Sequence, residues 1–174
     1  FYEENARKVI NFTKSPDMYG INYVNPYQGC EHGCIYCYAR NSHEYWGFSA
    51  GIDFESKIMV KKNAAELIEK KFQSKTWVCS PLSLSGNTDC YQPAERKYQI
   101  TRKILETCLK YKNPVGILTK NSLVLRDLDI LIELAKSNLV HVFMSITTLN
   151  EKLRIALEPR TATATKRLKT LETL

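Results

Sequence analysis

The chain has 174 residues, of which 44% are hydrophobic and 25% charged, and these values are typical of one globular domain with a real core. No apolar run reaches the roughly 18 residues that a membrane-spanning helix needs, so we expect no membrane partner. The formal net charge of +7 favours anionic partners, and six cysteines without a visible signal peptide predict reduced thiols in the cytoplasm.

The first elements lead into a loop that is rich in cysteine. Residues 1–20 are polar and irregular in pattern, and we expect an N-terminal extension that packs on the domain. A short strand is expected over residues 21–26, where Pro26 stops it because proline has no amide hydrogen for the ladder. After the cysteine loop, residues 34–45 are expected to form a helix that ends near Gly47.

The middle of the chain predicts two strands and one capped helix. A weak strand is expected over residues 57–60. Asn63 and Glu66 have the spacing of a capping box, which predicts a helix that continues to about Gln73. Residues 76–80 are apolar enough for the next strand, which Pro81 would break, and Cys79 would then be a core residue.

The second half alternates helices with strands, which predicts parallel βα units and an α/β fold. Cys108 lies on the apolar stripe of its helix, so we expect it to pack in the core. Cys90 lies in a loop, where packing is favoured over a second metal site or a hydrogen-atom donor. The expected elements are a loop at 83–93, helices at 94–111, 127–137, 149–157 and 165–174, and strands at 115–118 and 139–146.

Three cysteines dominate the loop after the first strand. Cys30, Cys34 and Cys37 follow one another with three and then two residues between them, and Gly29 and Gly33 allow the backbone to curl there. Three thiolates on one short loop suit an iron–sulfur cluster, which would keep one iron open for chemistry. A structural zinc ion needs four closed ligands.

Other interpretations of the same cysteines stay open at this point. A structural zinc site would recruit His43 or His32 as its fourth ligand. Buried packing is a poorer explanation, because Glu, His and Gly separate the cysteines. Disulfides are disfavoured because nothing indicates secretion.

With Tyr36 directly before Cys37, the cysteine motif resembles that of the radical S-adenosylmethionine (radical SAM) superfamily. Further segments are similar to the branch of this superfamily that contains spore photoproduct lyase; they are Asn25–Cys30, Cys37–Arg40, Gly86–Asp89 and Glu158–Thr161. The resemblance implies a radical SAM domain over residues 21–174, built as a partial (βα) barrel. About four to five βα units are recognisable, so we expect a domain that stops before its C-terminal part.

The resemblance also implies the cofactors and the reaction. Cys30, Cys34 and Cys37 would hold a [4Fe-4S] cluster whose open iron binds SAM. An electron donor such as flavodoxin or ferredoxin would reduce the cluster, and reductive cleavage of SAM would generate a 5′-deoxyadenosyl radical. The branch that contains spore photoproduct lyase suggests nucleic acid as the substrate.

Residues at the carboxyl ends of the expected strands would contact SAM, because ligands of parallel βα folds bind there. Lys120 offers a cation to the carboxylate of SAM, and Thr88 and Ser145 offer hydroxyl groups. Tyr36 offers an aromatic wall for adenine. Taken singly, each has a simpler explanation, because solvated lysines and strand-end hydroxyls are common.

The basic residues are unevenly distributed. Residues 1–60 hold five Lys or Arg against seven Asp or Glu, whereas residues 61–174 hold twenty against eleven. A basic half can bind DNA or RNA, but the lysines can equally form the solvated faces of helices. The rivals to a radical SAM enzyme are therefore a zinc-stabilised nucleic-acid-binding module without catalysis and an inactive protein that keeps only the fold.

Overall fold

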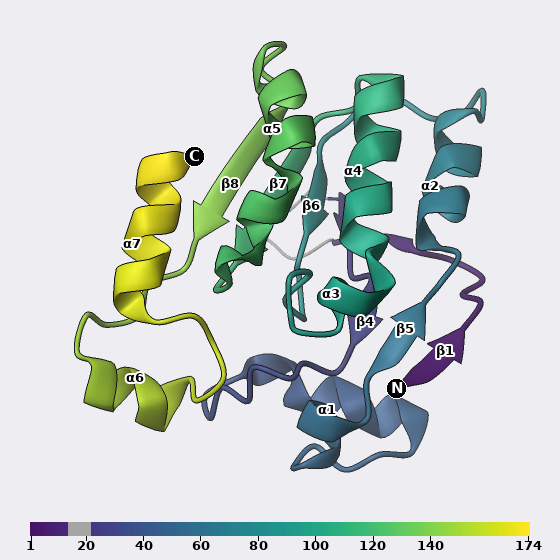
Figure 1. The fold of residues 1–174 in the computed structure, drawn as a ribbon. Helices are drawn as coiled ribbons and strands as arrows, with labels where there is room; N and C mark the ends of the chain where they lie inside the picture. Colours follow the sequence, from purple (N-terminus) through teal and green to yellow (C-terminus); the bar gives the residue numbers. More distant parts are fainter. Residues whose placement is uncertain (14–21) are drawn as a thin grey trace.

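The computed structural model describes residues 1–13 and 22–174, and a five-stranded sheet lies at its centre (Figure 1). Its strands follow the order β2-β3-β6-β7-β8. The last four run parallel in chain order, whereas β2 pairs antiparallel with β3 at one edge. This arrangement confirms the predicted α/β architecture. The strands are β2 (Ile10–Phe12), β3 (Asn22–Val24), β6 (Leu82–Leu84), β7 (Val115–Thr119) and β8 (Val140–Met144).

A second, three-stranded sheet has the order β1-β5-β4, in which β1 pairs parallel and β4 antiparallel with β5. The first residues of the chain therefore contribute a strand to each sheet, and the expectation of an irregular start was wrong. The pattern of residues 1–13 does not indicate these strands, because pairing with β5 and with β3, and not the local pattern, places them in the two sheets. The part of the expected extension at 14–20 lies outside the described residues. The strands are β1 (Tyr2–Glu4), β4 (Tyr27–Gln28) and β5 (Met59–Lys61).

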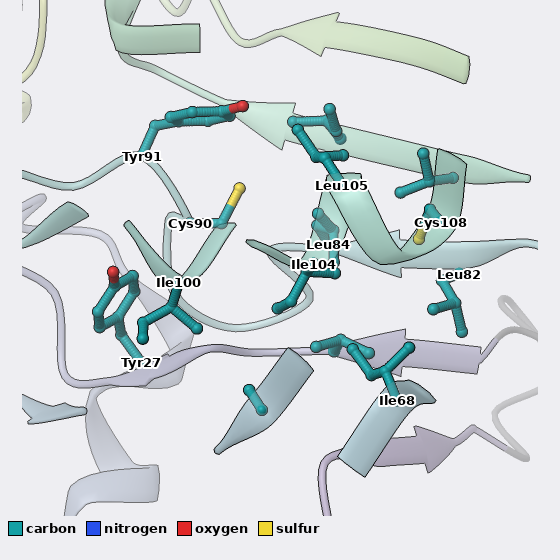
Figure 2. Close-up of a cluster of buried hydrophobic side chains, with 14 of the residues drawn as sticks. Tyr27, Ile68, Leu82, Leu84, Cys90, Tyr91, Ile100, Ile104, Leu105 and Cys108 are labelled. Carbon is teal, nitrogen blue, oxygen red and sulfur yellow. The ribbon is translucent and has the colours of Figure 1, made fainter. Parts of the chain in front are cut away.

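Three helices lie side by side over one face of the large sheet (Figure 1). Ile104, Leu105 and Cys108 on the middle helix are fully buried, which confirms its apolar stripe and the core position of Cys108. These side chains pack toward Leu82 and Leu84 of β6 (Figure 2). Burying one such aliphatic side chain stabilises the fold by about 1.5–3 kcal/mol. The helices are α2 (Ala64–Phe72), α4 (Ile100–Tyr111) and α5 (Leu128–Ala135).

The remaining helices lie near the ends of the parallel strands. A 3₁₀ helix, η2 (Tyr38–Trp46), begins later than the helix expected from residue 34 and ends at Gly47, as predicted. None of the helices in the described residues is long and apolar enough to cross a membrane. The others are α1 (Asp53–Ser56), α3 (Glu95–Tyr98), η3 (Ser122–Asp127), α6 (Glu151–Leu157) and α7 (Ala164–Thr173).

The expectation of a strand at 76–80 was wrong, because the strand in this part of the chain is β6, which begins after Pro81. Val78 is 80% exposed, whereas Leu82 and Leu84 are fully buried. Burial of Leu82 and Leu84 therefore selects the paired segment. Cys79 is exposed, so its expected core role was also wrong.

Two expected helix starts also differ from the structure. The capping box was wrong, because the amide of Asn63 does not cap α2 but bonds with both the N–H and the carbonyl of Ala6, each at 2.9 Å. The helix expected at 94–111 breaks at Gln99, whose φ is +52°. Glu95 compensates the break, since its Oε2 accepts the N–H of Thr101 at 3.0 Å and so caps α4.

Candidate functional site

The cysteine loop, residues 29–37, connects β4 to η2. Gly29 has a φ of +82°, and a Cβ there would lie 2.9 Å from the carbonyl oxygen of Phe54, so only glycine fits this turn. The N–H of Cys30 donates to the same carbonyl at 2.8 Å. The loop is thereby anchored to α1 through its backbone.

Two of the cysteines face a cavity of about 140 Å³ at the ends of β6 and β7. Cys34 and Cys37 line it together with Tyr36, Thr88 and Lys120, so five of the seven predicted site residues meet there. The other lining residues are Tyr38, Ser85, Gly86, Asn87, Asp89, Leu118 and Thr119.

Two predicted residues lie outside the cavity lining. Cys30 is only 7% exposed and packs with Ala39 and Phe54. Ser145 follows β8, where its N–H donates to the carbonyl of Thr119 at 2.9 Å.

The hydroxyl of Thr88, which does line the cavity, donates to the carbonyl of Tyr27 at 2.6 Å and so joins its own loop to the residues before Cys30.

The environment of the thiols sets their proton affinity. Burial raises the pKa of Cys30 to about 12, and the negative charge of Asp89 adds to the effect. Burial also raises the pKa of Cys34 to about 11, against the opposing charge of Lys120. Because metals bind cysteine as the thiolate, binding of a metal or cluster to this loop has to release the protons of the thiols.

The donor chemistry of the loop fits an iron–sulfur cluster. Cys30, Cys34 and Cys37 are all free thiols, and two of them face a cavity beside a lysine. Three thiolates are the ligand set of a cluster that keeps one iron open. Within residues 1–13 and 22–174, no three His, Cys, Asp or Glu side chains are close enough together to hold a single metal ion.

The two histidines considered as zinc ligands occupy different environments. His43 is fully buried, and its ring packs against Phe48 and Phe54 at centroid distances of 5.4 and 5.5 Å. Neither of its ring nitrogens has a hydrogen-bond partner among the described residues. His32 lies within the cysteine loop, where its Nδ1 is 3.4 Å from Asp89 and its Nε2 is 3.3 Å from the amide nitrogen of Asn121.

Asp89 organises the base of the cavity, a role that the sequence reasoning did not assign. Its carboxylate accepts hydrogen bonds from Thr119 Oγ1 at 2.8 Å and from the N–H of Lys120 at 2.7 Å. The N–H of Tyr91 donates to it at 2.8 Å, and His32 approaches it from the cysteine loop. Asp89 thus connects the loops after β4, β6 and β7. Its position in the Gly86–Asp89 motif was the available signal.

Gln92 also holds the cysteine loop, and the sequence reasoning did not assign this role to it. Its Nε2 donates to the carbonyl of Gly29 at 3.1 Å, and its Oε1 accepts the N–H of Glu31 at 3.0 Å. Glu31 returns the contact, since its Oε2 accepts the N–H of Ala94 at 2.6 Å. A buried glutamine that satisfies two backbone groups rigidifies a loop without adding charge.

The Glu158–Thr161 motif and the preceding Leu157 also hold the cysteine loop. The N–H of Ile35 donates to the carbonyl of Leu157 at 3.0 Å, and the N–H of Arg160 donates to that of His32 at 3.2 Å. The hydroxyl of Tyr36 donates to the carboxylate of Glu158. The motif therefore contacts the cysteine loop directly.

Comparisons with known proteins agree with this architecture. The family model of the radical SAM superfamily matches residues 24–174. The uncharacterised protein Rv2578c of Mycobacterium tuberculosis is 34% identical over 169 residues, which make up 97% of this chain and 50% of that protein. The uncharacterised protein MJ0683 of Methanocaldococcus jannaschii is 34% identical over 170 residues, or 97% of this chain and 60% of that protein. The chain therefore spans about half the length of the curated relatives it matches.

The solved structures extend the comparison to the fold. Spore photoproduct lyase complexed with dinucleoside spore photoproduct matches with a TM-score of 0.67 at 17% identity, covering 98% of this chain and 46% of that chain. A mutant of the same enzyme gives a TM-score of 0.66 at 19% identity. These matches confirm the predicted partial barrel. With the family model matching most of its length, the chain belongs to the radical SAM superfamily.

Proposed function

We propose that this chain forms the core of a radical SAM enzyme in which Cys30, Cys34 and Cys37 hold a [4Fe-4S] cluster. One observation carries the proposal: Cys34, Cys37 and Lys120 line a single cavity, although Lys120 comes from a different βα unit. Membership of the superfamily implies both the cluster and SAM. When bound and reduced, the cluster would supply the electron that cleaves SAM into methionine and a 5′-deoxyadenosyl radical.

The side chains of this chain would bind and orient SAM. Lys120 would donate to the carboxylate of SAM, and Asp89 supports it by accepting the N–H of Lys120 at 2.7 Å. Tyr36 would pack against adenine, and Thr88 and Ser145 would supply polar contacts around the cavity. A flavodoxin or ferredoxin would deliver the electron, which agrees with the expected cytoplasmic location.

We propose nucleic acid as the substrate class to test first. The related spore photoproduct lyase structure contains a dinucleoside spore photoproduct. Residues 61–174 carry twenty Lys or Arg against eleven Asp or Glu, a balance that attracts a phosphate backbone.

Anaerobic reconstitution with iron and sulfide tests the cluster. We expect a brown protein with about four irons per chain, and we expect Cys30→Ala, Cys34→Ala and Cys37→Ala each to lose the cluster because two thiolates do not retain it. Cys108→Ala should keep the full iron content, because Cys108 is buried in the core. A colourless protein with one tightly bound zinc ion would overturn the proposal in favour of a zinc module.

A further inference from the structure

Residues 158–167, which comprise the connection from α6 to α7 and the first turn of α7, contact three of the four predicted SAM-binding residues. The N–H of Ala162 donates to the carbonyl of Lys120 at 3.3 Å. Nη1 of Arg167 donates to the carbonyl of Ser145 at 2.8 Å. The carboxylate of Glu158 accepts the hydroxyl of Tyr36. One segment thus reaches residues from the cysteine loop and from the ends of β7 and β8.

Glu158 is a fully buried acid with a complete set of partners. Its Oε2 lies 2.6 Å from Nη2 of Arg167, which is 1% exposed. Its Oε1 accepts the hydroxyl of Thr147 at 2.6 Å in addition to that of Tyr36. Burial by itself would raise the pKa of Glu158, but the hydrogen bonds from Thr147, Tyr36 and Arg167 outweigh burial and lower the pKa. The carboxylate is therefore a charged acceptor at neutral pH.

Packing by itself does not hold the ring of Tyr36. The side chain is 49% exposed where it lines the cavity, between Cys34 and Cys37 in the sequence. Its hydroxyl reaches Glu158 and lies 3.2 Å from Oγ1 of Thr147. A half-exposed ring keeps one orientation only when its polar end is anchored, and a charged acceptor anchors it more strongly than a neutral one.

We propose that Glu158 is a positioning residue that acts through the Tyr36 hydroxyl, holding the Tyr36 ring and the cysteine loop in the geometry that binds SAM. Arg167 is the counter-charge that keeps Glu158 ionised in the interior. The effect of Glu158 on SAM binding rests on the proposed function, whereas its anchoring of the cysteine loop does not. Glu158 itself makes no contact with SAM in this assignment.

A double-mutant cycle with Glu158→Gln and Tyr36→Phe tests the inference. Tyr36→Phe removes the hydroxyl but keeps the ring and the Glu158–Arg167 pair, so it remains informative where loss of the buried charge lowers stability. In the cluster-loaded protein we expect each variant to weaken SAM binding about tenfold at unchanged iron content. The double variant should bind no more weakly than the weaker single variant, because both changes break one contact.

Amide hydrogen exchange on the cluster-free protein gives a second readout that does not depend on any cofactor. Both single variants should speed exchange across residues 31–37, and the double variant should exchange no faster than the faster single variant. Glu133→Gln is the matched control, because Glu133 forms an exposed pair with Lys136 at 2.7 Å, away from the cysteine loop, and should leave exchange in residues 31–37 and SAM affinity unchanged.

The outcomes of these two experiments separate the anchoring of the cysteine loop by Glu158 from the proposed radical SAM function. Unchanged exchange of residues 31–37 in Tyr36→Phe would overturn the inference, whether or not the protein takes up iron. Losses of SAM affinity that multiply in the double variant would also overturn it, because Glu158 would then act independently of Tyr36. A wild-type protein that takes up no iron, but shows the coupled change in exchange, would overturn the proposed function and leave the anchoring of the loop established.

Discussion

Lys120 is the residue whose predicted role can be tested most directly. Its side chain lines the cavity with Cys34 and Cys37, and its N–H is held by Asp89. If Lys120 pairs with the carboxylate of SAM, Lys120→Ala should remove a charge-assisted bond of about 1.5–3 kcal/mol, or roughly ten- to a hundredfold in affinity. Equilibrium binding of SAM to the cluster-loaded variant measures this loss.

The control for Lys120 is a lysine of the same charge on the outer surface. Lys136 is mostly exposed and pairs with Glu133, so Lys136→Ala should leave SAM affinity unchanged. Equal effects of the two substitutions would mean that net charge, and not the position of Lys120, governs binding. Unchanged affinity in Lys120→Ala would remove that residue from the site.

The lowered pKa of Glu158 predicts a specific pH dependence of stability. Burial opposes ionisation, but the bonds from Thr147, Tyr36 and Arg167 bring the pKa below its ordinary value of 4.5. An acid with a lowered folded-state pKa stabilises the fold fully above its unfolded pKa and loses that contribution as pH falls through the folded value. Wild-type protein should therefore be more stable than Glu158→Gln at pH 7, with a gap that narrows below about pH 4.

Urea unfolding of the cluster-free protein between pH 3 and pH 7 measures that gap. Glu133→Gln is a suitable comparison, because Glu133 lies on the surface and forms an exposed pair with Lys136. Its stability relative to wild type should stay within about 1 kcal/mol across the range. A gap for Glu158→Gln that is independent of pH would show that the ionised carboxylate is not the stabilising group.

At the scale of elements, Asn63 connects the N-terminal strands to α2. Its side chain bonds with both backbone groups of Ala6, so Asn63→Ala should leave these groups unpaired and cost about 1–3 kcal/mol of unfolding free energy. Proteolysis near residues 5–9 should accelerate as β1 and β2 loosen. Chemical unfolding with limited proteolysis measures both effects.

Glu66→Ala separates this role from helix capping. A capping box would need Glu66 as much as Asn63, whereas the structure assigns the long-range bonds to Asn63. We therefore expect Glu66→Ala to change stability by less than about 0.5 kcal/mol. Similar losses of unfolding free energy in Asn63→Ala and Glu66→Ala would instead support the capping box.

At the scale of the whole molecule, the uneven charge predicts how nucleic acid would bind. If the basic half of the chain engages a phosphate backbone, affinity should fall steeply as salt rises, because binding releases condensed counterions. A substrate should also stimulate SAM cleavage, which a solvated basic surface would not do. Titration of the cluster-loaded protein with duplex and single-stranded DNA at two salt concentrations measures both properties.

The outcomes of this titration point to different substrates. Saturable binding that stimulates SAM cleavage supports a nucleic-acid substrate. Weak binding that disappears at moderate salt, with cleavage unchanged, would assign the lysines to the outer faces of the helices. Lys70, Lys103 and Lys110 are exposed residues of α2 and α4, on the layer that covers the sheet, which makes the second outcome a real alternative.

Much of the element order could be predicted because it depends on local patterns. The apolar periodicity of α4 and the buried run of β7 are readable within a dozen residues; β7 begins where it was expected, and α4 ends where it was expected. β6 was misplaced because residues 76–80 and 82–84 are both apolar, and only burial against α4 and β7 distinguishes them. Propensity does not contain that information.

By itself, the sequence determined the cysteine loop, the α/β class and the family resemblance, because ligand spacing and periodicity are local properties. Only the tertiary structure decided which residues support that loop. Tyr36 and Glu158 are 122 residues apart, and Glu31 and Gln92 are 61 residues apart, yet each pair forms a hydrogen bond. Such pairs depend on how the βα units close around one end of the sheet, and that closure arises from burial of the whole core.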